Sequence, residues 1–522
     1  MSEELPTGQD APQSQPEPLH GTQLALLTIA IALATFMEVL DLTIVNVSVP
    51  AIAGSLGVSP NEGTWTISSY SLAAAIMQPL TGWLGRRFGE VRTFVTSMSL
   101  FVVFSALCGM ASSMPMLVAC RLLQGAVSGP MVPMAQALLI RNFPREKIGV
   151  AMGLWAMVIF VAPIFGPILG GWITDNYSWP WLFYINLPIG ALSVFMVATL
   201  LKGRDSQRVK VPVDVVGLAL LVIGVGALQF MLDNGNDKDW FNSWLITTSA
   251  IAAVVALTVL IVWELTDRHP IVDLALFRIH NYRIAVICIC CGFFCFFGVT
   301  VVYPLWLQLA MGYTATWAGL ATAPVGVLAL LLMPYVGRTL DTMNLRVASS
   351  FGFLAMAGSM LWLSTMNEQA SFGQIIAPRL LQGVGLAFFF LPLNKILLSP
   401  MRPDQVASAA GLSNFLRTMT GSVSTAVCIW VWSRRTDSHG ATLSEHITST
   451  GNWPVYRSHL QQFGVQGVAA LRSAEELILQ QARTMGANDL FRAFGYVFIL
   501  LAPLVWLARP PFRNPGGPPG AH

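Results

Sequence analysis

Charged side chains inside long apolar runs are the residues of this sequence whose types and spacing suggest chemistry. Glu38 and Asp41 lie three positions apart in the first run, so a helix there would place both carboxyl groups on one face. Two neighbouring carboxylates in a medium of low dielectric constant each disfavour the ionised form of the other. Such a pair can take up a proton on one side of a membrane and release it on the other. The spacing therefore predicts a proton-coupling site, with Asp41 as its main group.

Arginines inside two other apolar runs are candidate partners for substrate or for these carboxyl groups. A charge within a membrane-spanning helix is costly, so each one suggests a function. Arg121 can hold Asp41 in a purely structural ion pair, or it can alternate with a proton as the partner of that carboxylate. We expect the second role, which makes Arg121 part of the proton-coupling site. Arg379 is either a structural feature of the fold or, together with Gln136 and Asn414, part of a substrate cavity.

The composition indicates that these residues lie in a membrane. The chain has 522 residues, of which 54% are hydrophobic and only 11% are charged. Soluble domains carry about 25% charged residues, so a water-soluble enzyme and a disordered chain are both excluded. The net charge of +3 gives no general electrostatic support for a nucleic-acid partner.

About fourteen apolar runs are long enough to form membrane-spanning helices, which need roughly 20 residues. They lie at 24–49, 63–83, 93–112, 114–138, 149–172, 182–201, 216–232, 244–263, 284–304, 316–336, 347–365, 373–398, 408–433 and 491–508. Lys and Arg residues gather in every second connection, which fits the positive-inside rule if both termini lie in the cytoplasm. The short outer connections hold one basic residue, Lys238. The sequence thus predicts an all-α polytopic membrane protein with 14 transmembrane helices.

An internal repeat divides the predicted helices into two halves. The segment Arg121–Gly125 recurs unchanged as Arg379–Gly383. Parallel halves related by an axis along the membrane normal are typical of transporters, which hold substrate between the halves near the midplane. The expected segments are a disordered cytoplasmic tail at 1–23, a six-helix half at 24–202, two linker helices with their loops at 203–282, a six-helix half at 283–508 and a cytoplasmic tail at 509–522.

One predicted outer connection, residues 434–490, is long and polar. Its stretch 466–485 has the composition of a helix and carries an apolar stripe of Val468, Leu471, Leu477 and Leu479. We expect an amphipathic helix at the outer membrane face. It either packs on the protein itself or offers a docking surface to an extracytoplasmic protein.

Proline and glycine are dense at the end of the fifth apolar run, within Ala162–Gly171. The residues concerned are Pro163, Gly166, Pro167, Gly170 and Gly171. Proline kinks a helix, and glycine lets a neighbouring helix approach closely. The segment therefore suits movement or sealing between two conformations, although tight packing alone would also explain it.

Motifs of other protein classes are absent from the sequence. It contains no Gly-Lys-Ser or Gly-Lys-Thr phosphate-binding loop, no His-Glu-x-x-His zinc motif and no Gly-x-Ser-x-Gly nucleophile motif. The seven cysteines lie in apolar runs and have no metal-ligand spacing with histidine. We therefore expect no cofactor, no metal site and no enzymatic activity.

Several segments resemble the major facilitator superfamily, and within it the fourteen-span drug:proton antiporters of the EmrB/QacA type. The segments that carry the resemblance are Leu40–Pro50, Arg121–Gly125 and Ala162–Gly171, and those that resemble the EmrB branch in particular are Met231–Gly235, Trp263–Asp267 and Gly312–Gly319. The resemblance covers nearly the whole chain. It implies two six-helix halves plus two inserted helices, and it assigns Arg121 to proton transfer.

The resemblance also implies a function. A protein of this type would be a proton-coupled multidrug efflux antiporter that exports hydrophobic or amphipathic small molecules by alternating access. It would lie in a bacterial inner membrane as part of a tripartite pump, with a periplasmic membrane-fusion adaptor and an outer-membrane channel. The alternative on the same fold is a dedicated exporter of one compound, such as a fatty acid or a siderophore. A sensor or assembly factor without transport would need no buried proton site.

The chain departs from the family pattern in the loop after the second run. The family carries an acidic residue four positions after the first glycine, but here Gly82 is followed by Arg86 at that place. The charge-relay role of that acid therefore cannot be carried over. The second-half copy keeps an acid, Asp341, and Lys395 is expected to extend to the inner membrane surface.

Overall fold

Helices form all the regular secondary structure in the part of the chain that the computed structural model describes. The described residues are 19, 21–144, 147–206, 208–209, 212–236, 238–267, 270–402, 404–446, 458 and 467–512. Long apolar sequences satisfy their backbone hydrogen bonds within each helix, which is what a bilayer requires.

The first half of the chain forms six helical passes, several of them broken. They are α1 (Gly21–Ile44), α4 (Trp65–Met77) with α5 (Thr81–Phe88), α6 (Glu90–Gly109), α7 (Met114–Ser128) with α8 (Met131–Asn142), α9 (Ile148–Asn176), and α10 (Trp181–Tyr184) with α11 (Asn186–Leu200). Two short helices, α2 (Val49–Leu56) and α3 (Pro60–Gly63), follow α1. The breaks before α5 and α8 fall at Pro79 and Pro130, because proline lacks the N–H that would continue the helix.

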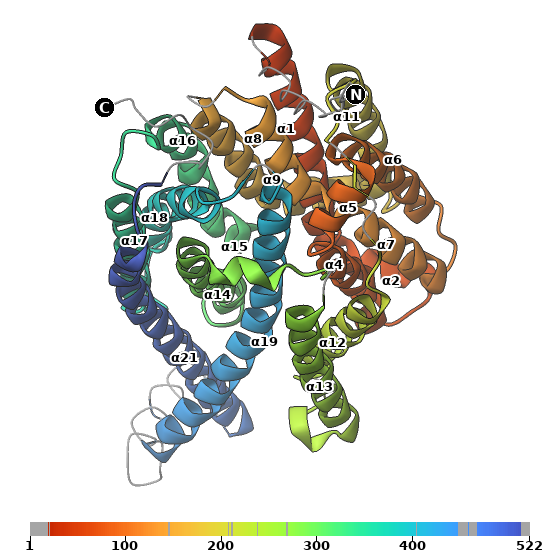
Figure 1. Ribbon diagram of the computed structural model, residues 1–522. Helices are drawn as coiled ribbons and strands as arrows, with labels where there is room; N and C mark the ends of the chain where they lie inside the picture. The colour runs from red at the N-terminus through yellow and green to blue at the C-terminus, as the bar shows by residue number, and fades with distance from the viewer. Residues whose placement is uncertain are drawn as a thin grey trace, which may run out of the picture.

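The remaining passes comprise two inserted helices and a second half. They are α12 (Val215–Asn234) and α13 (Trp244–Thr266), then α14 (His280–Leu309), α15 (Ala315–Thr322) with α16 (Pro324–Thr339), α17 (Leu345–Leu363), α18 (Phe372–Leu398), α19 (Val406–His446) and α21 (Val468–Leu504). Single 3₁₀ turns are η1 (Asn46–Ser48), η3 (Trp240–Asn242), η4 (Leu274–Arg278) and η5 (Val505–Leu507). The two halves lie side by side, and α12 and α13 pack as a pair at one edge, where α12 contacts α4 and α19 (Figure 1).

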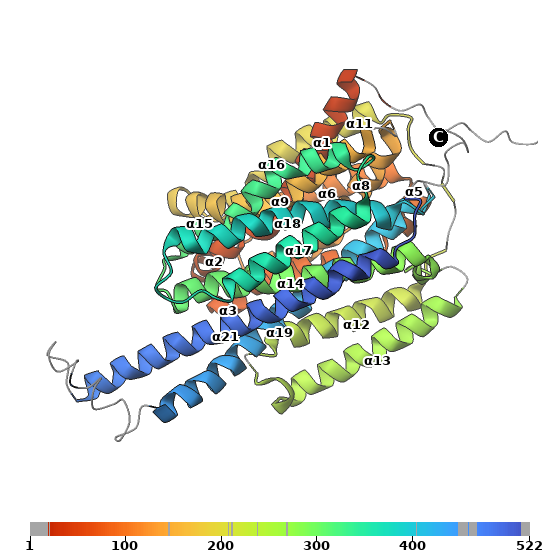
Figure 2. The same ribbon diagram turned by 90° about the vertical axis from the view of Figure 1, so that its left-hand side faces the viewer.

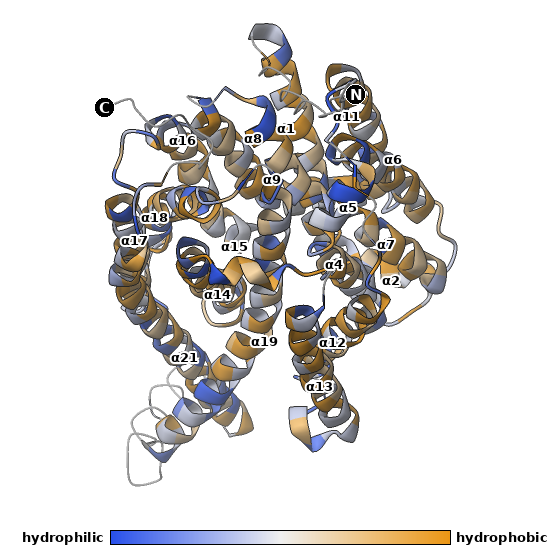
Figure 3. Cartoon of the chain, in the orientation of Figure 1, coloured by the Kyte–Doolittle hydropathy of each residue, from blue (hydrophilic) through white to orange (hydrophobic). Residues whose placement is uncertain are grey.

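The fourteen predicted runs each coincide with one of these helices or helix pairs, so the predicted all-α fold is confirmed. Eleven described helices or joined helix pairs are long and apolar enough to cross a membrane, and the bent α9 makes a twelfth. Apolar residues predominate along the helices, while α5 and several connections are hydrophilic (Figure 3).

The outer connection at 434–490 differs from the prediction of a polar loop with a separate amphipathic helix. α19 continues to His446, and α21 runs without interruption from Val468 into the last pass. The reason is local: the residues after Val468 are mostly good helix formers, such as Ala, Leu, Glu and Gln, so the last pass begins early. α19 and α21 pack against each other and extend together past the other helices (Figure 2).

The two halves meet closely at the end of the bundle that carries the connections α5–α6, α8–α9 and α16–α17, here called the basic end. Gly82 in α5 faces the start of α19, and a Cβ placed there would lie 1.8 Å from Ser408 Oγ. Gly149 in α9 faces α16, and a Cβ there would lie 2.3 Å from the carbonyl oxygen of Gly337. Only glycine permits these approaches, and they close the basic end between the halves.

Candidate proton and substrate site

A buried ion pair joins α1 to α7 in the first half. Arg121 Nη1 lies 2.5 Å from Asp41 Oδ2, and both side chains are 0% exposed. Arg121 Nε also donates to the carbonyl oxygen of Thr66 at 2.9 Å. The predicted association of Asp41 with Arg121 is therefore present in the structure, and the arginine is additionally fixed to the start of α4.

Amide side chains complete the environment of this ion pair. Asn186 Nδ2 on α11 donates to Asp41 Oδ1 at 2.8 Å and approaches Ser105 Oγ at 3.0 Å. Gln124 on α7 accepts from Arg121 Nη1 at 2.8 Å, and its Nε2 lies 3.4 Å from Asp41 Oδ1. Gln124 and Asn186 were missed at the sequence level. Gln124 could have been found as the repeated glutamine one helical turn after Arg121.

Glu38 lies outside the ion pair, although it shares a helix face with Asp41. Its side chain is buried at 5% exposure, and its Oε2 has no hydrogen-bond partner among the described residues. Tyr70 from α4 covers the site, with its ring 4.1 Å from the guanidinium carbon of Arg121. The site thus contains one paired and one unpaired carboxyl group.

The repeat in the second half keeps the arginine but not the acid. Arg379 on α18 is 1% exposed, donates to Gln382 Oε1, and stacks 4.4 Å from the ring of Tyr303 on α14. No Asp or Glu among the described residues forms an ion pair with it. The two halves therefore share the Arg-x-x-Gln pattern and an aromatic cover, and only the first half adds a carboxylate.

The other predicted cavity residues are buried at separate places. Gln136 on α8 is 2% exposed, and its Nε2 lies 3.9 Å from Met152 Sδ. Asn414 on α19 is 5% exposed and donates to the carbonyl oxygen of Ala410 at 2.9 Å. The structure does not bring either residue to the Asp41 ion pair.

The proline- and glycine-rich segment of α9 packs on α1 next to the ion pair. A Cβ at Gly166 would lie 2.1 Å from Thr43 Oγ1, and one at Gly170 would lie 2.3 Å from the carbonyl oxygen of Ile44. The parts of α9 before and after this contact, Ile148–Pro163 and Ile168–Asn176, meet at 45°. Gly171 lies in the second part, and Pro167 lies in α9 with its side chain outside the described residues. The close approach and the bend predicted for this segment are both present.

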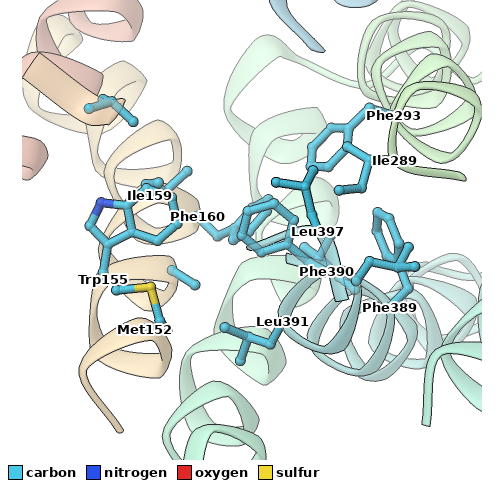
Figure 4. Packing of buried hydrophobic residues seen from close by; sticks show 14 of the residues in the cluster. Met152, Trp155, Ile159, Phe160, Ile289, Phe293, Phe389, Phe390, Leu391 and Leu397 are labelled. Atoms are coloured by element: carbon cyan, nitrogen blue, oxygen red, sulfur yellow. The ribbon is translucent and has the colours of Figure 1, made fainter. Parts of the chain in front are cut away.

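An aromatic cluster joins the two halves beside one further arginine. Phe160 on α9 packs edge-on against Phe390 on α18, with ring centroids 5.1 Å apart, and stacks 6.4 Å from Phe293 on α14 (Figure 4). The guanidinium carbon of Arg417 on α19 lies 5.3 Å from the Phe293 ring and 5.7 Å from the Phe390 ring. Arg417 is half-buried and forms no ion pair with any described residue. It was not assigned to the site from the sequence.

Ion pairs tie the connections at the basic end to the ends of α8 and α18. Arg141 Nη1 on α8 lies 2.9 Å from Glu90 Oε2 at the start of α6. Lys395 Nζ on α18 lies 2.5 Å from Asp341 Oδ1 and donates to the carbonyl oxygen of Leu340 at 2.9 Å. Glu90 thus supplies in the first half the acid that is missing at Arg86.

Within the described residues, no group of three or more His, Cys, Asp and Glu side chains is arranged to hold a metal ion. The polar interactions of the buried residues described above are ion pairs, hydrogen bonds and cation–π contacts.

Comparisons with known proteins agree with this arrangement. Residues 31–425 match the family model described as Major Facilitator Superfamily. The chain is 45% identical to the multidrug export protein EmrB of Escherichia coli strain K12, over 97% of this chain and 100% of that protein. It is also 45% identical to the fatty acid resistance protein FarB of Neisseria gonorrhoeae, over 96% of this chain and 99% of that protein.

A solved structure supports the fold. The crystal structure of the human organic anion transporter MFSD10 superposes with a TM-score of 0.59 at 13% identity, covering 93% of this chain and 100% of that one. The match to the family model, the sequence identity to the relatives and the similarity to the solved structure all indicate the same family. The chain is a multi-pass membrane transporter that belongs to the major facilitator superfamily and, within it, to the EmrB-type drug antiporters.

Proposed function

We propose that the protein exports hydrophobic and amphipathic small molecules in exchange for protons. The observation that carries this proposal is the Asp41–Arg121 ion pair, fully buried between α1 and α7. Breaking a buried ion pair by removing the charge of one partner is strongly unfavourable, by about 3–5 kcal/mol. Protonation of Asp41 is such a removal of charge, so it can drive a rearrangement of the helices around it.

The coupling follows from the partners of each group. When a proton neutralises Asp41, Arg121 loses its counter-charge but keeps Thr66 and Gln124 as acceptors. α1 is then released from α7, while α9 remains in contact with α1 through Gly166 and Gly170. A shift of α1 is therefore passed to α9, which contacts α16 of the second half at the basic end. This chain of contacts links the proton to alternating access.

Glu38 is the second proton carrier in this proposal. We propose that Glu38 carries a proton in this arrangement, because its Oε2 is buried without a hydrogen-bond partner among the described residues. It shares a helix face with Asp41 and can deliver that proton once Arg121 moves away. In this proposal Asp41, Glu38 and Arg121 together form the coupling site.

We place substrate between the halves, against the aromatic cluster of Phe160, Phe293 and Phe390. Aromatic rings bind flat hydrophobic molecules over a large area without demanding one shape, which suits a broad substrate range. Arg417 provides a positive charge at the edge of this surface. Gln136, Asn414 and Arg379 remain proposed cavity residues that would be exposed when the halves separate.

We propose an inner-membrane location in a bacterium, with both termini in the cytoplasm and the basic end facing inward. The tripartite assembly is part of this proposal. The paired extension of α19 and α21 then projects outward, and the four residues of the predicted apolar stripe on α21 are exposed. An adaptor in the periplasm is the proposed partner of that extension, with an outer-membrane channel beyond it.

The similarity to FarB supports a second candidate, a dedicated exporter of fatty acids. Proteoliposomes with an imposed pH gradient would test both functions. We expect gradient-driven uptake of several unrelated hydrophobic dyes into vesicles in which the basic end faces outward. Uptake of a fatty acid alone, with no dye transported, would support the dedicated exporter. No gradient-dependent uptake of either class would contradict proton-coupled export.

A further inference from the structure

A groove opens beside α5, α6 and α7 at the basic end, away from the coupling site. It has a volume of ≈ 410 Å³, and its lining includes the apolar side chains of Leu84, Phe88, Leu100 and Val127. Phe88 is 50% exposed and Leu100 is 39% exposed, so the groove opens at the outer surface of the bundle. None of its lining residues belongs to the Asp41–Arg121 network.

Three arginines lie at the mouth of this groove: Arg87, Arg92 and Arg208. Two of them share one carboxylate, since Arg92 Nε is 3.8 Å and Arg208 Nη2 is 3.6 Å from Asp205 Oδ2. Asp205 Oδ1 also accepts from the backbone N–H of Val91 at 3.0 Å. Arg92 and Arg208 together carry more positive charge than the one carboxylate that they share, Asp205, can neutralise.

We propose that this groove binds an anionic phospholipid from the leaflet at the basic end. Its phosphate would lie among the three arginines, which suit phosphate because guanidinium groups donate two parallel hydrogen bonds. One acyl chain would lie along the apolar wall towards Leu100 and Val127. Basic pockets between membrane helices are suited to anionic headgroups, and arginines near the membrane surface attract them electrostatically.

The apolar wall favours a lipid over a free phosphate ion. A free anion would use the arginines alone and leave Leu84, Phe88 and Leu100 without an occupant. The same wall accommodates an acyl chain. The groove is lined in part by α5, whose Gly82 lies against Ser408 of the second half, so its occupant lies next to the contact that closes the basic end.

Native mass spectrometry of the purified full chain, titrated with phosphatidylglycerol or phosphatidylcholine, tests the site without requiring transport. We expect the native protein to retain phosphatidylglycerol about tenfold more strongly than phosphatidylcholine. The triple variant Arg87→Gln, Arg92→Gln, Arg208→Gln should lose this preference. The matched control Arg283→Gln, Arg338→Gln, Arg402→Gln removes the same charge from exposed arginines outside the groove and keeps the preference.

A second variant tests the acyl-chain part. Ser97 lines the groove and has no charge, so Ser97→Leu fills the groove while keeping the arginines. We expect it to weaken retention of phosphatidylglycerol by at least threefold, and we expect excess inorganic phosphate not to displace the lipid. Equal retention by the triple variant and the native protein would overturn the proposal. The proposal would also be overturned if the control variant lost the preference for phosphatidylglycerol to the same extent as the triple variant. It would likewise be overturned if Ser97→Leu retained phosphatidylglycerol as the native protein does, or if inorganic phosphate displaced the bound lipid.

Discussion

Arg141 at the end of α8 lies 2.9 Å from Glu90 at the start of α6, and this contact has a counterpart in the second half. There, Lys395 near the end of α18 lies 2.5 Å from Asp341 in the α16–α17 connection. In each half, an ion pair between one acid and one base thus links the fourth pass to the start of the third pass or to the connection just before it. The acids occupy different places in the two halves, which is why the first was not recognised from the motif.

Glu90→Gln should therefore destabilise the protein. Glu90 is 6% exposed, and the substitution leaves Arg141 without its charged acceptor. A hydrogen bond to a charged group contributes about 1.5–3 kcal/mol, so we expect a loss of that size in the free energy of unfolding. Thermal unfolding in detergent would measure it, and Glu476→Gln, at an exposed position of α21, is the control that should leave the midpoint unchanged.

The comparison of sequence and structure separates what local pattern determines from what packing determines. Run length located the fourteen passes, and helical spacing placed Glu38 and Asp41 on one face. Spacing could not show that Asp41 pairs with Arg121 while Glu38 stays unpaired, because that depends on the packing of α4, α7 and α11 around them. The role of Glu90 and the exposure of Arg417 likewise depend on contacts between distant segments.

Gly170→Val should abolish transport. A Cβ at Gly170 meets the carbonyl oxygen of Ile44 at 2.3 Å, so valine would force α9 away from α1 and disconnect the coupling site from the second half. We expect at least a tenfold loss of transport rate with normal membrane insertion, measured in proteoliposomes. Gly226→Val on α12 is the matched control, because a Cβ there meets nothing within 4 Å. A similar loss in both variants would argue against a specific role for the α1–α9 contact.

Arg417→Ala should change substrate selection more than transport itself. The guanidinium is half-buried beside Phe293 and Phe390 and forms no ion pair with a described residue, so it can receive an anionic group. We expect KM for anionic amphiphiles to rise about tenfold or more, the equivalent of about 1.4 kcal/mol, with KM for cationic dyes unchanged or lower. Arg417→Lys should retain part of the selectivity. An equal rise for both classes would show that Arg417 only supports the fold.

Val468→Glu with Leu471→Glu should weaken binding of the proposed periplasmic adaptor and leave transport in liposomes intact. Both side chains are exposed on the outer part of α21, at 69% and 57%, where an apolar docking surface would lie. The control Ala441→Glu with Ser444→Glu adds the same charge to exposed positions on α19 without removing a large apolar side chain. Co-purification with the adaptor would show whether the α21 double variant binds it more weakly than the α19 double variant does. If both pairs behaved alike, the exposed stripe would not be the docking surface.

Substrate-dependent proton movement in proteoliposomes, compared between the native chain and Asp41→Asn, tests the central claim most directly. The amide keeps the shape of the side chain and its place beside Asn186 but can neither carry a proton nor pair with Arg121 as a charge. Asp233→Asn on α12 is the control for an acid outside the coupling site. The account predicts that addition of substrate moves protons in the native and control proteins and not in Asp41→Asn. Equal proton movement in Asp41→Asn and the native protein would contradict it.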